Sequence, residues 1–161
     1  MQSASLHPQQ QHDSSRQPAS WATARQATLH CLTGCAIGEV LGMVIGAWLG
    51  LHDVPTIVLA IALAFVFGYA LTVRSVLRSG LSLRRAVRVA LAADTVSILV
   101  MEIVDNGIVL AVPGAMAAGL ADVLFWGALA AGLAVAFVVT LPVNRALMSR
   151  GRGHAVVHAA H

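Results

Sequence analysis

Two cysteines and a glutamate lie at a regular spacing in the first long apolar stretch of the chain. Cys31, Cys35 and Glu39 are four residues apart, which places them along one row of an α-helix. His30 directly precedes the first cysteine. Thiolate ligands favour Cu(I), and a mixture of thiolate, imidazole and carboxylate suits Zn(II). The spacing therefore predicts that this stretch presents metal ligands inward.

Acidic side chains occur in three of the four apolar stretches. Five of the seven acidic residues of the chain fall within such stretches, and they are Glu39, Asp94, Glu102, Asp105 and Asp122. A charge at the bilayer centre costs about 2.5–3.5 kcal/mol even on the lenient insertion scale. Because no arginine or lysine lies deep in these stretches, a proton, a hydrogen bond, water or a metal cation must offset the charge. The groups expected to line a membrane-embedded cation site are Glu39, Met101, Glu102 and Asp105, with Asp94, Asn106 and Asp122 as further polar groups.

Three histidines end the chain at helical spacing. His154, His158 and His161 share one face if this segment is helical, and imidazole is a common ligand of zinc, copper, nickel and iron. We expect them to join His30 in a ligand group on the cytoplasmic side. The alternative is an interfacial turn or a frayed terminus without a ligand role.

The composition indicates which elements must position these groups. Of 161 residues, 58% are hydrophobic and 11% charged, whereas soluble domains carry about a quarter charged residues. Apolar runs at 27–50, 54–73, 86–112 and 115–142 are each long enough to cross a hydrocarbon layer of about 30 Å. We therefore predict an all-α, integral-membrane four-helix bundle over residues 26–148. A disordered polar tail (1–25) precedes it and a histidine-rich cytoplasmic tail (149–161) follows it.

The distribution of arginine predicts the orientation of the bundle. All ten arginines lie at span ends, before the first run, between the second and third, and after the fourth. With four spans these segments share one side, and the positive-inside rule makes that side cytoplasmic for both termini. The net charge of +3 is therefore a topological signal and does not indicate nucleic-acid binding.

A row of glycines accompanies the thiols. Glycines at four-residue spacing let another backbone approach closely, which is typical of helix packing in membranes. The partner is a helix of the same bundle or of a second copy in a homo-oligomer. The row consists of Gly34, Gly38, Gly42, Gly46 and Gly50.

Four motifs together resemble one known family. They are His30-Cys31-x3-Cys35-x2-Gly38-Glu39, Met101-Glu102-x2-Asp105-Asn106, Pro142-Val143-Asn144-Arg145 and Gly151-x-Gly153-His154-x3-His158-x2-His161. From about residue 26 to its end, the chain resembles a bacterial integral-membrane family known as domain of unknown function 4396. The resemblance implies a small bacterial inner-membrane protein, without an established activity.

The leading hypothesis is a multi-pass membrane protein that binds or translocates a cation, with copper or zinc as the metal ion. One alternative is a haem or redox protein that uses His30 and the tail histidines as axial ligands. Another is a structural bundle that oligomerises through its glycine row and keeps its buried acids protonated. The sequence shows no nucleophile–base set and no phosphate-binding loop, so it does not favour an enzyme.

Overall fold

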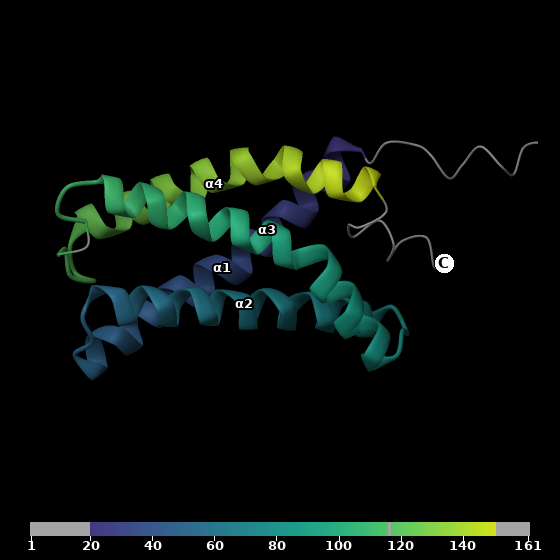
Figure 1. The fold of residues 1–161 in the computed structure, drawn as a ribbon, viewed down its shortest axis with the longest axis horizontal. Coiled ribbons are helices and arrows are strands. Elements are labelled where there is room, and N and C mark those ends of the chain that lie inside the picture. Colours follow the sequence, from purple (N-terminus) through teal and green to yellow (C-terminus); the bar gives the residue numbers. More distant parts are fainter. Residues whose placement is uncertain (1–19, 116, 151–161) are drawn as a thin grey trace, which may run out of the picture.

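The chain folds into four long α-helices. The computed structural model describes residues 20–115 and 117–150, and every regular element within them is an α-helix. The helices are α1 (Trp21–Leu49), α2 (Asp53–Arg78), α3 (Leu83–Ala111) and α4 (Val123–Ser149). Consecutive helices run in opposite directions, so the start of α1, the α2–α3 link and the end of α4 lie at one end of the bundle (Figure 1). The prediction of an all-α four-helix bundle is confirmed.

Local capping sets the ends of α1. The Ser20 side chain accepts a hydrogen bond from the Thr23 backbone N–H at 3.1 Å, which satisfies one of the free donors of the first turn. The helix ends at Gly50, whose φ of 64° is the left-handed conformation that commonly closes a helix. The first three helices all begin before the apolar runs predicted at 27–50, 54–73 and 86–112, because a helix can continue beyond its apolar segment into polar turns.

The fourth helix begins later than the apolar pattern predicts. The predicted span at 115–142 corresponds to α4 at Val123–Ser149, and Gly114 lies in a turn with a φ of 82°. Asp122 is exposed, and its carboxylate caps α4 by accepting from the Leu124 backbone N–H at 2.8 Å. The prediction that Asp122 lies inside a span is therefore wrong, because a short acidic side chain stabilises a helix start better than a helix interior.

Small residues bring α1 and α2 into backbone contact. A Cβ atom added at Gly34 would lie 2.7 Å from the Cα atom of Gly68, and the neighbouring glycines of α1 meet α2 in the same way. In order along α1, Gly34, Gly38, Gly42 and Gly46 face Gly68, Ala64, Ala60 and Thr56. Gly50 has no such neighbour and ends the helix instead. Because α2 covers this face, the homo-oligomer predicted through the glycine row would need another face of α1.

Three of the helices are long and apolar enough to cross a membrane, namely α1, α2 and α4. The remaining helix, α3, has the same length as α1 but carries three arginines in its first turns and three acids further along. Its outward face is apolar nevertheless, with Ile103 64% and Leu110 62% exposed. Large exposed apolar side chains on all four helices are typical of a protein surrounded by lipid.

Candidate functional site

Polar side chains from all four helices are buried in the interior of the bundle. We call this set the polar column, and its members are Thr28, Glu39, Thr56, Thr72, Asp94, Ser97, Glu102, Asp105, Thr140 and Asn144. The acids all come from α1 and α3, whereas α2 and α4 contribute hydroxyl groups and one amide. Small residues pack around the column and leave room for these side chains. Three levels of contact follow one another along it.

The first level joins three helices near the end of the bundle that carries the arginines. Asn144 on α4 donates from Nδ2 to the hydroxyl of Thr28 on α1 at 2.8 Å. Its Oδ1 atom accepts a hydrogen bond from the hydroxyl of Ser97 on α3. In the sequence, Asn144 stood out only as part of a family motif, although a single amide within an apolar span is itself a signal of a buried hydrogen bond.

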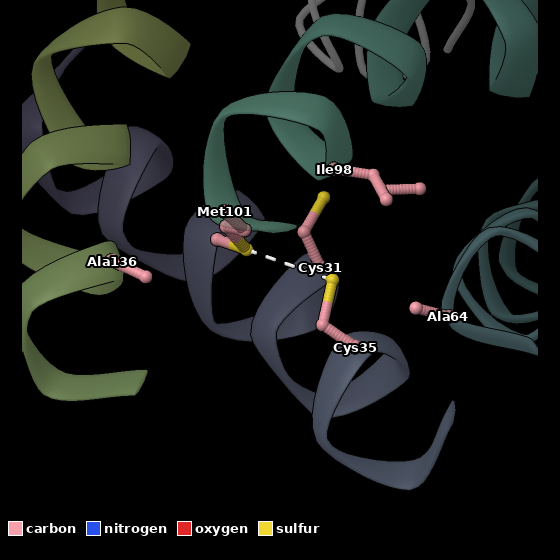
Figure 2. Close-up of a cluster of buried hydrophobic side chains, with 6 residues drawn as sticks. All are labelled: Cys31, Cys35, Ala64, Ile98, Met101 and Ala136. Atoms are coloured by element: carbon pink, nitrogen blue, oxygen red, sulfur yellow. Dashed lines mark hydrogen bonds between the residues drawn. The ribbon is translucent and has the colours of Figure 1, made fainter. Parts of the chain in front are cut away.

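The second level contains three sulfur atoms. The Cys35 thiol on α1 donates to the Met101 sulfur on α3 at 3.9 Å, and Cys31 lies one turn earlier on the same face of α1 (Figure 2). Both cysteines are free and 1% exposed. The Cys31 thiol donates to Oδ1 of Asp94 at 3.7 Å. Each thiol therefore has a partner on α3.

Carboxyl groups flank both thiols. Thr72 on α2 approaches the carboxylate of Asp94, which is the partner of Cys31. The carboxyl group of Glu102 lies close enough to the Cys35 thiol to interact with it electrostatically. A metal ion held by these thiols would require them to lose their protons, and the adjacent carboxyl groups would be the groups to take those protons up.

The third level is acidic and lies nearer the opposite end of the bundle. Glu39 on α1 and Asp105 on α3 line the same small cavity and are close enough to interact electrostatically. Asn106 donates from Nδ2 to the Glu102 backbone oxygen at 2.9 Å and to its Oε2 atom at 3.2 Å. Both carboxylate oxygens of Glu39, Oε1 of Glu102 and Oδ1 of Asp105 are buried without a hydrogen-bond partner.

A small cavity adjoins this acidic level. It has a volume of about 30 Å³, close to the space that one water molecule occupies in the liquid, and Glu39, Asp105 and Asn106 line its polar side. Phe125, in the first turn of α4, lies on its apolar side. A Cβ atom at Gly132 would collide with the Asp105 carboxylate, so the α4 backbone packs directly on that side chain. The glycine thus makes the space that Asp105 occupies.

The column contains no basic side chain among the residues that the structure describes. The arginines of the described helices lie toward the end where α1 starts and α4 ends, and Arg145 stacks on the Trp21 ring with its guanidinium carbon 4.2 Å from the ring centroid. The low dielectric of a buried site strengthens electrostatic interactions, so the acids make the interior attractive for positive charge.

A family model described as "Domain of unknown function (DUF4396)" matches residues 20–153. The chain belongs to this family. The match covers the whole polar column of this DUF4396 protein, which confirms the resemblance found in the sequence motifs. Comparisons of the DUF4396 chain with curated proteins and with solved structures found no match.

The structure does not bring the predicted metal ligands of the first helix together in one site. In this DUF4396 protein His30 hydrogen-bonds to the backbone of Leu71 on α2, whereas the neighbouring Cys31 reaches Asp94 on α3. Within residues 20–115 and 117–150, no three His, Cys, Asp or Glu side chains form a group that could hold a metal ion. The tail histidines His154, His158 and His161 lie outside the described residues. Cys31, Cys35, Glu39, Met101, Glu102 and Asp105 do share the interior, at successive levels.

Proposed function

We propose that this DUF4396 protein lies in the bacterial inner membrane and binds or translocates a transition-metal cation, copper or zinc. One observation carries the proposal: the sulfur atoms of Cys31, Cys35 and Met101 gather between α1 and α3, with carboxyl groups beside both thiols. No buried arginine accompanies them in the part of the chain that the structure describes. Such an environment suits a positive ion and disfavours an anion.

Copper(I) fits these ligands better than zinc. Soft thiolate and thioether ligands select Cu(I), which accepts a low coordination number, whereas a structural Zn(II) site takes four ligands in a tetrahedron. Methionine is not a usual zinc ligand, and the described residues offer no group of three His, Cys, Asp or Glu side chains. A zinc site would therefore need ligands from the tail histidines. The sulfur level by itself favours Cu(I).

The arrangement of arginine and tryptophan supports a four-span topology with both termini in the cytoplasm. The arginine-rich end includes the α2–α3 link, and basic residues are enriched on the cytoplasmic side of membrane proteins. Trp21 lies at the start of α1, whereas Trp48 and Trp126 lie near the opposite end, where tryptophan marks the membrane interface. In this arrangement α3 also crosses the bilayer and keeps its acids inside the bundle. The sulfur level then lies closer to the cytoplasm than the acidic level does.

Titration of the purified full chain with Cu(I), in the presence of a chromophoric competitor, tests this proposal. We expect a Cys31→Ser/Cys35→Ser variant to lose Cu(I) binding and Met101→Leu to weaken it by about tenfold. Met148→Leu is the matched control, because Met148 is a buried thioether in a separate cluster with Ala24 and Ala27. Equal, weak binding by the wild type and the double cysteine variant would reject the proposal.

A further inference from the structure

We propose that the outer surface between the start of α1 and the end of α4 binds one anionic phospholipid, with its phosphate group at Arg145 and an acyl chain along α1. The proposed metal ligands lie in the interior of the bundle instead. This lipid site rests on the membrane location proposed above, and it does not depend on metal binding. Three features carry it: a basic cavity, an apolar groove and the row of α1 residues that links them.

A cavity of about 270 Å³ lies where the start of α1 meets the end of α4 (Figure 1). The residues that line it are Trp21 from α1 and Pro142, Arg145, Ala146 and Ser149 from α4. The guanidinium carbon of Arg145 lies 4.2 Å from the centroid of the Trp21 ring. A guanidinium over a ring contacts it with its face, whereas it donates hydrogen bonds to phosphate oxygens in its plane. The cavity thus combines a phosphate-binding group with a tryptophan, which is typical of the membrane interface.

The surface around the cavity is basic. Arg25 is exposed one turn after Trp21 on α1, and Arg150 is exposed at the end of α4. Among the described residues, the acids lie either buried in the polar column or at the opposite end of the bundle, and they are Glu39, Asp94, Glu102 and Asp105 in the column and Asp53 and Asp122 at that end. Basic surfaces between membrane helices attract anionic lipid headgroups. The charge of this surface therefore favours an anionic lipid over a zwitterionic one.

An open apolar groove of about 570 Å³ lies along the outward face of α1. Leu29, Thr33, Ile37 and Leu41 line it from α1, and Leu133 lines it from α4. The hydroxyl of Thr33 donates to the backbone oxygen of Leu29 at 2.8 Å, so its proton needs no partner in the groove. At about 1.5 Å per residue the groove extends about 18 Å from Leu29 to Leu41, close to the hydrocarbon thickness of one leaflet, about 15 Å. Its polarity and length suit one acyl chain.

The cavity and the groove lie on one row of α1. Residues four apart on a helix are neighbours on its surface, and this row consists of Trp21, Arg25, Leu29, Thr33, Ile37 and Leu41. All six side chains are exposed. A phosphate group held at the first two positions of the row therefore lies next to the start of the groove. A soluble phosphate would occupy the cavity alone, so the two features together favour a phospholipid.

Native mass spectrometry of the purified full chain tests the site. The protein is mixed with phosphatidylglycerol and phosphatidylcholine that carry identical acyl chains, and the retained lipid is identified by its mass. We expect the wild type to retain one phosphatidylglycerol, and Arg145→Gln to lower this retention by about tenfold, because charge-assisted hydrogen bonds are lost. Ala36→Phe, which fills the groove without changing the charge, should also lower it. Arg84→Gln is the matched control, since it removes the same charge at the start of α3, away from the end of α4 (Figure 1).

Equal retention of the two lipids by the wild type overturns the proposal, and this comparison needs no variant. Unchanged retention in Arg145→Gln or Ala36→Phe, with helix content verified by circular dichroism, also overturns it. An equal loss in Arg84→Gln does the same, because general surface charge would then explain the binding. Displacement of the lipid by inorganic phosphate would show that the ligand is a soluble phosphate and would likewise overturn the proposal. Failure of Cu(I) binding would reject only the metal proposal, since this experiment contains no copper.

Discussion

The amide of Asn144 on α4 donates a hydrogen bond of 2.8 Å to the hydroxyl of Thr28 on α1, across 116 residues of sequence. The same amide accepts from Ser97 on α3, so one side chain connects three of the four helices. In a membrane there is little hydrophobic driving force between helices, and such contacts help to fix their arrangement. The amide therefore holds α4 against the pair of helices that carries the sulfur and acidic levels.

We expect Asn144→Ala to reduce the free energy of unfolding by about 1–2 kcal/mol, because it removes two buried side-chain hydrogen bonds between helices and leaves Thr28 and Ser97 only their bonds to backbone oxygens of their own helices. Thermal unfolding of the purified protein in detergent, followed by circular dichroism, measures the effect. Thr33→Val serves as a control, since Thr33 is exposed and its hydroxyl donates only to the backbone oxygen of Leu29. If both variants unfold like the wild type, the three-helix contact does not contribute to stability.

A substitution at Gly38 tests how closely α1 packs against α2. A Cβ atom at this position would overlap the backbone of Ala64, so Gly38→Ala must push the two helices apart. We expect a loss of about 1–3 kcal/mol in the same unfolding assay, as for other overpacked interiors. Gly127→Ala on α4 meets nothing within 4 Å and should leave stability unchanged or raise it by about 0.5–1 kcal/mol. Similar behaviour of the two variants would contradict the packing described.

Cysteine labelling can test which end of the bundle faces the cytoplasm. In a background without Cys31 and Cys35, we introduce Asp53→Cys at the start of α2 or Ser82→Cys at the cap of α3. A membrane-impermeant maleimide added to intact cells should label the first variant and leave the second unlabelled until the membrane is permeabilised. The reverse pattern would place the arginine-rich end outside the cell. Labelling of both would place the two positions on the same side, so that α2, the helix between them, would not cross the membrane.

A substitution of Glu102 distinguishes a protein that binds or moves a cation from a bundle with only a structural role. Its carboxyl group lies near the Cys35 thiol, and under the proposed metal binding it would offset the charge of the ion and take up the thiol proton. We expect Glu102→Gln to lower Cu(I) uptake into proteoliposomes by about tenfold. Asp53→Asn, an exposed acid, should have no effect. Unchanged uptake in Glu102→Gln would favour the structural alternative, in which the buried acids serve only packing.

Much of the fold follows from the sequence because membrane helices must bury polar groups and expose apolar ones. The acids and thiols of α1 and α3 were predictable as interior groups for that reason, and Asp94, Glu102 and Asp105 are all buried. Apolar composition does not show where a helix starts, so the span predicted at 115–142 begins before α4 does, and the capping role of Asp122 escaped prediction. Neighbouring residues on a helix point in different directions, which is why His30 meets α2 whereas Cys31 meets α3.

The haem alternative finds less support in the described helices. Axial ligation within the bundle would use histidines in its interior, and of the histidines in the described residues only the half-buried His30 qualifies, since His52 is exposed just before α2. A second ligand would have to come from the tail histidines. A Soret band in purified membranes containing the protein would revive this alternative.

X-ray absorption at the copper edge, on the full chain loaded with one equivalent of Cu(I), tests the central claim most directly. If the metal occupies the level formed by Cys31, Cys35 and Met101, sulfur atoms dominate its first coordination sphere, and the signal disappears in Cys31→Ser/Cys35→Ser. Coordination by nitrogen or oxygen alone, or an identical spectrum from the double variant, would contradict the assignment.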